Sequence, residues 1–186
     1  MADHCNMHGE ITGGGTRIAF IDTQVHGLLA VPFEENRVHE GYAFFGTDYD
    51  ASIATAAPKY YRITTPNTTL WSHLRIEAAA LTAGLIELYE TPTENEPAGA
   101  GTGITLRNVD RNSSRTATVV LKYDPTFAAD GTLIWFARLE AAAAPHGNSV
   151  PIILGQNKTY VIKFTSDAND NKLWLNCIFV EHTNLS

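Results

Sequence analysis

Apolar and polar residues alternate along much of this chain, most clearly near its end, over Pro151–His182. Two alternating runs lie on either side of Ser166–Asn171, whose Ser, Asp and Asn residues favour a turn. The apolar positions that share one face of these runs are Tyr160, Ile162, Phe164, Leu173, Leu175, Cys177 and Phe179. Because a period of two places such residues on one side of a strand, the sequence predicts an antiparallel hairpin that joins a larger sheet.

Further short runs of this kind recur between turn signals. They predict strands over Glu40–Phe45, Tyr60–Thr64, Thr116–Tyr123 and Gly131–Leu139. The first of these is expected to end at Gly46, and the polar, alanine-rich segment Thr47–Pro58 is expected to be a connection. The composition of the last run, extended to Ala144, is also compatible with a helix.

Residues Trp71–Ala80 and Gly84–Glu90 have two interpretations. Helix propensity favours a single helix, whereas alternation favours two strands joined by a hairpin loop at Thr82-Ala83-Gly84. A helix of this length would be expected to carry a capping residue, and no cap is visible in the sequence. We therefore predict the hairpin.

Seven to nine short strands, with no clear amphipathic helix and no βαβ spacing, predict an all-β fold. We expect an antiparallel β-sandwich of jelly-roll type. Residues 1–16 are polar and end near Gly13-Gly14-Gly15, which is too costly in entropy for a regular element. The expected organisation is a flexible N-terminal arm over residues 1–16 and a single β-sandwich domain over residues 17–186.

Composition narrows the classes of function. The 186 residues are 44% hydrophobic and 18% charged, which favours a folded core, and the net charge of −7 argues against nucleic acid and anionic membranes as partners. No apolar run reaches the roughly 18 residues of a membrane span. The N-terminus lacks a secretory signal pattern, so synthesis and folding in a cytoplasm are expected. Cys5 and Cys177 are interpreted as free thiols, with Cys177 a small core residue, and a disulfide between them is the alternative.

Motifs of catalysis are not evident: the sequence has no phosphate-binding loop, paired-cysteine zinc pattern or nucleophile elbow. We therefore expect no catalysis and no cofactor, although a glycosidase or a cupin-like metal protein stays an alternative. Seven scattered histidines are more typical of structural roles. Removal of Met1 would expose Ala2-Asp3-His4, which can bind Cu(II) or Ni(II), while a solvated tail is the simpler interpretation.

Binding residues are easier to nominate. The loop Thr91–Gly103 is long and carries Glu94 and Glu96, and loops of this length are usually functional. The polar segment that follows it carries Arg107, Arg111 and Arg115, whose guanidinium groups suit pairing with carboxylates within the fold or across a subunit contact. Phosphate binding is the alternative for these arginines. Exposed tryptophans such as Trp71 and Trp135 could stack on sugars, but in a sandwich they are more often core or interface residues.

Six segments occur in an order and spacing that resemble a known family. They are His39–Phe45 (HEGYAFF), Thr64–Thr68 (TTPNT), Ile86–Thr93 (IELYETPT), Gly101–Ser114 (GTGITLRNVDRNSS), Lys122–Ile134 (KYDPTFAADGTLI) and Ile153–His182. Together they resemble a widespread family of small structural proteins from tailed bacteriophages, the head decoration, cement or minor capsid proteins. The resemblance covers roughly residues 38–182. This chain departs from the family pattern at Asn108-Val109-Asp110-Arg111 and at Phe179-Val180, which precedes Glu181-His182.

The resemblance implies a β-sandwich that is made in the host bacterial cytoplasm and binds the outside of a capsid. The implied partner is the major capsid protein, and the implied oligomer is a homotrimer at local three-fold positions, with no catalytic residues. The residues expected at interfaces are Arg107, Arg111, Arg115, Glu94, Glu96, Trp71 and Trp135. A carbohydrate- or receptor-binding module of a phage head appendage or fibre is the alternative.

Overall fold

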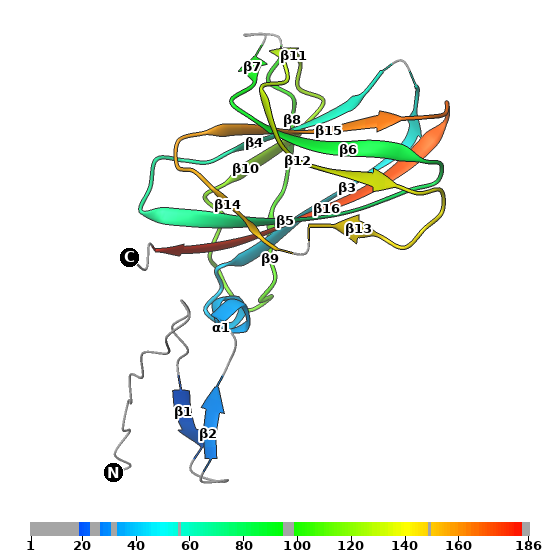
Figure 1. Cartoon of the computed structure of the whole chain (residues 1–186). Helices are drawn as coiled ribbons and strands as arrows, with labels where there is room; N and C mark the ends of the chain where they lie inside the picture. Colours follow the sequence, from blue (N-terminus) through cyan, green and yellow to red (C-terminus); the bar gives the residue numbers. More distant parts are fainter. Residues whose placement is uncertain are drawn as a thin grey trace.

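A computed structural model describes residues 19–22, 27–30, 33–55, 57–94, 99–148 and 150–183 of the chain. For residues 19–22, 27–30, Phe33 and Glu94 it describes the backbone alone. The expected arm over residues 1–16, Cys5 and Glu96 therefore lie outside the described residues. Two large antiparallel sheets face each other, as Figure 1 shows, and the expected all-β antiparallel sandwich is confirmed. Its jelly-roll connectivity stays a prediction.

Sheet I has the strand order β12-β6-β15-β4-β10-β8. Its strands are β4 (Lys59–Thr64), β6 (Gly84–Glu90), β8 (Thr102–Ile104), β10 (Val120–Tyr123), β12 (Thr132–Leu139) and β15 (Thr159–Ser166). Sheet II has the order β13-β5-β16-β3-β9, and β14 also pairs with β5. Its strands are β3 (Ala43–Ile53), β5 (Leu70–Ala80), β9 (Arg107–Asn108), β13 (His146–Gly147), β14 (Ile152–Leu154) and β16 (Asn171–Thr183).

Smaller elements surround the sandwich. The strands β1 (Ala19–Asp22) and β2 (Gly27–Ala30) pair with each other in a sheet of their own, and so do β7 (Thr93–Glu94) and β11 (Phe127–Ala129). The helix α1 (Phe33–His39) contacts β16. No helix within the described ranges is long and apolar enough to cross a membrane.

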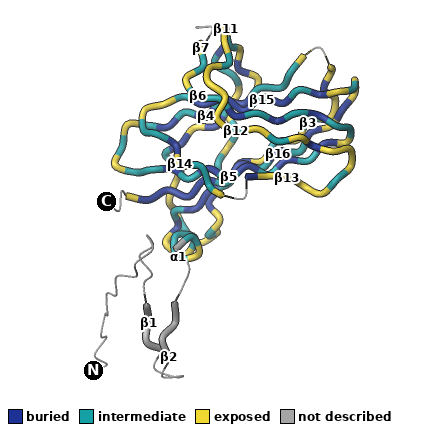
Figure 2. Tube along the Cα trace, viewed as in Figure 1, coloured by how far each residue is buried: buried dark blue, intermediate teal, exposed yellow. Residues whose placement is uncertain are grey.

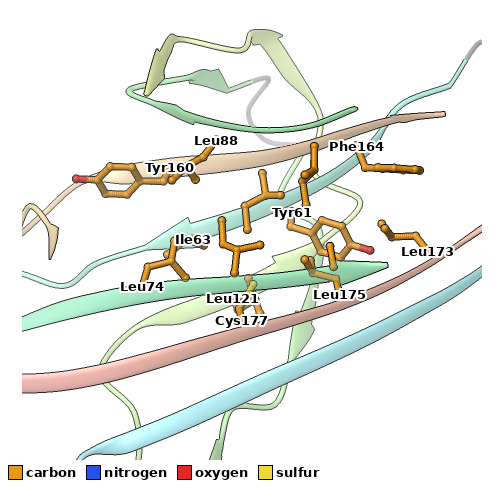
Figure 3. Close-up of a cluster of buried hydrophobic side chains, with 14 of the residues drawn as sticks. Tyr61, Ile63, Leu74, Leu88, Leu121, Tyr160, Phe164, Leu173, Leu175 and Cys177 are labelled. Carbon is orange, nitrogen blue, oxygen red and sulfur yellow. The ribbon is translucent and has the colours of Figure 1, made fainter. Parts of the chain in front are cut away.

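The core lies between the two sheets, where alternate residues of each long strand are buried, as Figure 2 shows. Figure 3 shows side chains of the two sheets meeting there. Those labelled from sheet I are Tyr61, Ile63, Leu88, Leu121, Tyr160 and Phe164, and those from sheet II are Leu74, Leu173, Leu175 and Cys177. The thiol of Cys177 is free and fully buried, so its predicted place in the core is confirmed.

The predicted closing hairpin is wrong in one respect. Both strands exist, but β15 pairs with β4 and β6 in sheet I, whereas β16 pairs with β3 and β5 in sheet II. The chain crosses between the sheets where the hairpin turn was expected. Alternation correctly assigns an apolar face to each strand, yet two such faces can meet across a core instead of lying side by side in one sheet.

The same correction applies to the predicted hairpin over Trp71–Glu90. Its two strands are confirmed, and the single helix is excluded, but β5 belongs to sheet II and β6 to sheet I. The two crossings are joined by Asn171, which is fully buried. Its Oδ1 accepts from the amide of Thr82 at 2.7 Å, and its Nδ2 donates to the carbonyl of Thr82 at 2.9 Å. The side-chain amide of Asn171 thus provides hydrogen-bond partners for backbone groups of the neighbouring crossing.

Three other expectations are corrected. Gly46 does not end a strand, because β3 continues to Ile53 and Thr47–Pro58 is therefore largely strand. Glycine is needed within this strand, since a Cβ there would lie 2.6 Å from a methyl carbon of Leu106 and 2.9 Å from one of Leu121. The loop predicted over Thr91–Gly103 contains β7 and the start of β8. Helix α1 was not predicted. Its seven residues carry acidic side chains in the first turn and basic side chains in the last turn, and this arrangement of charge stabilises the helix by interacting favourably with its dipole.

Candidate functional site

One side of the sandwich is formed by edge strands of both sheets. Strand β12 pairs with β6 and, among the described residues, has no second strand partner. Strands β13 and β14 pair only with β5 at the border of sheet II in the described part of the chain. These two borders lie on the same side of the molecule because β12 contacts both β13 and β5. We call this region the β12 side.

The β12 side exposes large apolar residues. They are Leu133, Ile134 and Phe136 of β12, Ile153 of β14, and Val150, which lies before β14. The exposed fractions reach 62% at Phe136 and 73% at Val150. Edge strands usually carry charged residues or proline that prevent pairing with another chain. On β12 the charged side chain is Arg138, which is paired with Asp167.

The local sequence explains why these side chains reach solvent. Leu133–Phe136 (LIWF) is a run of four apolar residues, and a strand with a period of two buries only every second one. Strand β12 pairs Leu133 with Tyr89 and Trp135 with Leu88, so the register shifts at Ile134. Such a bulge bends an edge strand and leaves one residue unpaired. Trp135 then packs against the core, and its two neighbours stay exposed.

A second region of interest is the segment that carries the three arginines, residues 107–119, which we call the arginine segment. Its start is held by Asn108, which is 8% exposed and donates from Nδ2 to the carbonyl of Gly41 at 2.8 Å. The Oδ1 of Asn108 accepts from the amide of Asp110 at 2.9 Å. The segment is therefore a structured loop that leaves the border strand β9 and packs against the start of β3.

Its other end is held by Glu181 of β16. This carboxylate is 1% exposed, and its Oε1 accepts from the amide of Thr118 at 2.8 Å, from the Thr118 hydroxyl at 2.9 Å and from the amide of Val119 at 3.2 Å. A pocket of about 370 Å³ opens beside this contact. Its lining residues are Tyr42, Phe44, Leu70, Ser114, Arg115, Thr116, Thr118 and Glu181.

The arginines themselves are exposed. The guanidinium of Arg115 stacks on the ring of Tyr42, 4.1 Å from its centroid, and Nη1 of Arg111 donates to the carbonyl of Asn108 at 3.4 Å. Arg107 lies on β9. These contacts leave hydrogen-bonding groups of the guanidiniums open to a partner, because a guanidinium has five donors.

The predicted interface residues do not form one site. Trp71 is half-buried on β5, opposite His182 of β16, and Trp135 lies on β12 in the other sheet. Glu94 lies on β7, where only its backbone is described, and Glu96 lies outside the described residues. Sequence analysis also missed the exposed residues of the β12 side. The four consecutive apolar residues of LIWF were the available signal.

Other sites were sought among the described residues. They contain no group of three or more His, Cys, Asp or Glu residues placed to hold a metal ion. The predicted Ala2-Asp3-His4 site lies outside the described ranges. Comparison of the chain with protein-family models, with curated proteins and with solved structures gave no match.

Proposed function

We propose that this chain is a structural virion protein that decorates and stabilises a bacteriophage capsid without catalysis. The proposal rests on the family resemblance of its motifs and on one structural observation, the exposed apolar residues of the β12 side. A protein that stays monomeric does not need large apolar side chains exposed at a sheet border, because such residues favour association with another chain. A jelly-roll connectivity and a place on the capsid exterior belong to the same proposal.

The partner proposed for the β12 side is another copy of this chain. A border strand offers unpaired backbone groups, and Phe136 and Ile134 offer apolar area next to them. In a trimer with three-fold symmetry each copy uses two different surfaces, so the β12 side would contact a different surface of the next copy. The contact closes into a ring, which prevents open-ended assembly.

The surface proposed to contact the major capsid protein is the arginine segment. It is anchored at both ends by Asn108 and Glu181, and it presents exposed guanidinium groups suited to carboxylates. A trimer would present three such segments, and repeated weak contacts on a symmetric lattice give avidity without high intrinsic affinity.

Light scattering on the purified protein tests the oligomer. We expect a trimer, and we expect Phe136→Asp to shift it toward monomer while circular dichroism stays unchanged. Tyr49→Asp is the matched control, because Tyr49 is an aromatic residue of similar exposure, 59%, on β3, which lies beyond β5 and β16 from the β12 side. Binding to capsids that lack the protein tests the capsid contact. A wild-type protein that is monomeric and does not bind capsids would refute the proposal.

Carbohydrate binding is the second candidate function. It is favoured by a group on the outer face of sheet I, where Lys163 lies 5.9 Å from the ring centroids of both Tyr60 and Tyr89 and is paired with Asp130 at 2.6 Å. Aromatic faces beside charged groups can stack on sugars and hydrogen-bond their hydroxyls. Glycan-array binding that Tyr89→Ala abolishes would favour this candidate over the capsid role.

A further inference from the structure

Two histidines from neighbouring strands of sheet II face each other directly. The Nε2 atoms of His73 (β5) and His182 (β16) lie 2.8 Å apart, and the two rings are nearly perpendicular, at 89°. His182 is 8% exposed and His73 is half-buried. We propose that this pair is a binding site for a transition-metal dication that prefers imidazole ligands at a right angle, such as Ni²⁺ or Cu²⁺, with water completing the coordination.

We infer the kind of metal from the distance between the two nitrogens. Two imidazole nitrogens about 2.0 Å from a metal lie about 2.8 Å apart when the angle between them is 90°, and about 3.3 Å apart at the tetrahedral angle. The observed 2.8 Å matches the right angle of square-planar and octahedral sites. Tetrahedral Zn²⁺ would require the two nitrogens to lie about 0.5 Å further apart.

The second nitrogen of His182 is already placed as it is in metal sites. Its Nδ1 lies 2.6 Å from the carbonyl oxygen of Thr183, which can only accept, so Nδ1 carries the hydrogen. In this tautomer the lone pair lies on Nε2 of His182. A metal-binding histidine typically donates its other ring N–H to a backbone carbonyl or a carboxylate in this way.

Without metal, Nε2 of His73 carries a hydrogen and donates it to Nε2 of His182. Metal binding requires His73 to change tautomer, with the proton leaving Nε2 and Nδ1 taking one from water. Both rings must also turn so that their lone pairs converge on the ion. Rotation about the bond to the ring is soft in histidine, because this torsion has broad minima.

Burial, and then the neighbouring His182, lower the pKa of His73. Glu34 of α1 acts in the opposite direction on this pKa, and its carboxylate is paired with Arg75 at 3.1 Å. The positive charge of Arg75, two residues from His73 on the same strand, is thus partly neutralised.

The test uses the full chain with Cys5→Ser, His4→Gln and His8→Gln, which removes the competing ligands near the N-terminus. Titration with NiCl₂ by calorimetry is expected to show one equivalent bound per chain, and Zn²⁺ is expected to bind more weakly. Ni²⁺ against Zn²⁺ is the informative comparison, because Cu²⁺ binds nitrogen ligands most tightly at almost any site. Electron paramagnetic resonance with Cu²⁺ is expected to report two imidazole nitrogens.

Variants in this background locate the site. His73→Gln should weaken Ni²⁺ binding by at least the roughly 10–100-fold that loss of even an outer partner costs a metal site. The double variant His39→Gln/His146→Gln is the control, because both side chains are exposed and should not affect binding. His182→Gln is a second test, read together with its melting temperature. Absence of stoichiometric Ni²⁺ binding, or equal binding by His73→Gln, would show that the pair is only a hydrogen bond and would overturn the proposal.

Discussion

Replacement of Glu181 by alanine should destabilise the protein strongly. Three donors converge on its Oε1, two of them backbone amides, and Val119 is 3% exposed. A hydrogen bond to a charged group is worth about 1.5–3 kcal/mol, and a buried amide left without a partner costs about 1–3 kcal/mol. The three bonds share one acceptor, the Thr118 hydroxyl can turn to another partner, and water can enter from the adjacent pocket. We therefore expect a loss of about 3–4 kcal/mol from the free energy of unfolding.

Two companion variants sharpen this prediction. Glu181→Gln keeps an oxygen acceptor but loses the charge, so it should cost about 1 kcal/mol. Glu140→Ala removes an exposed carboxylate and should stay within about 0.5 kcal/mol of wild type. Urea denaturation at one fixed protein concentration gives these values, because the stability of an oligomer depends on concentration.

Hydrogen exchange supplies the local readout. In wild type the amides of Thr118 and Val119 should be protected, and in Glu181→Ala they should exchange rapidly while those of the central strands stay protected. The reasoning would be refuted by a loss of less than about 1 kcal/mol, or by unchanged protection of these two amides.

Two further predictions concern titratable groups in the core and at its rim. Burial, and to a lesser extent the Asp48 carboxylate, raise the pKa of the Cys177 thiol to about 12. In a Cys5→Ser background, Cys177 should therefore resist a thiol reagent at pH 8 until urea unfolds the chain; rapid labelling of the native protein would contradict its burial. Burial raises the pKa of Asp50, but the hydrogen bonds from Lys59 and from the amide of Ser52, together with the charge of Lys59, outweigh burial, and the net pKa lies below 3.8. Ionised Asp50 thus stabilises the fold above the unfolded-state pKa, and this contribution is lost as the pH falls through the folded-state pKa. Lys59→Met should be less stable than wild type at pH 7, and the difference should shrink below about pH 4 in urea titrations; a difference that is constant with pH would contradict the assignment.

The sequence predicted where most strands lie but not which strands pair. Alternation over Tyr160–Phe164 and Leu173–Phe179 identifies buried faces, and it says nothing about whether two faces belong to one sheet or to opposite sheets. The deciding contacts are polar and distant in sequence, such as those of Asn171 with Thr82. A period of two cannot reveal them.

The predicted start of one strand was wrong for a related reason. The strand predicted over Thr116–Tyr123 begins at Val120, because Thr118 and Val119 donate their amides to Glu181 instead of to a neighbouring strand. Likewise the sequence located the three arginines, but it did not show that Asn108 anchors one end of the arginine segment and Glu181 the other. Side chains that replace a strand partner are invisible to propensity and to pattern.

The end of β16 illustrates why these polar exceptions matter for function. Alternation places Glu181 on the same face as Phe179, which faces the core, so a carboxylate stands where an apolar residue is expected. The next residue, His182, faces the other way and meets His73. One strand end therefore holds the arginine segment on one side and forms the histidine pair on the other. Polar residues in a buried strand are costly unless each has a partner, and here both have one. The closing strand thus supplies more than core packing, because its last residues position both the arginine segment and the histidine pair, the two regions for which we propose binding.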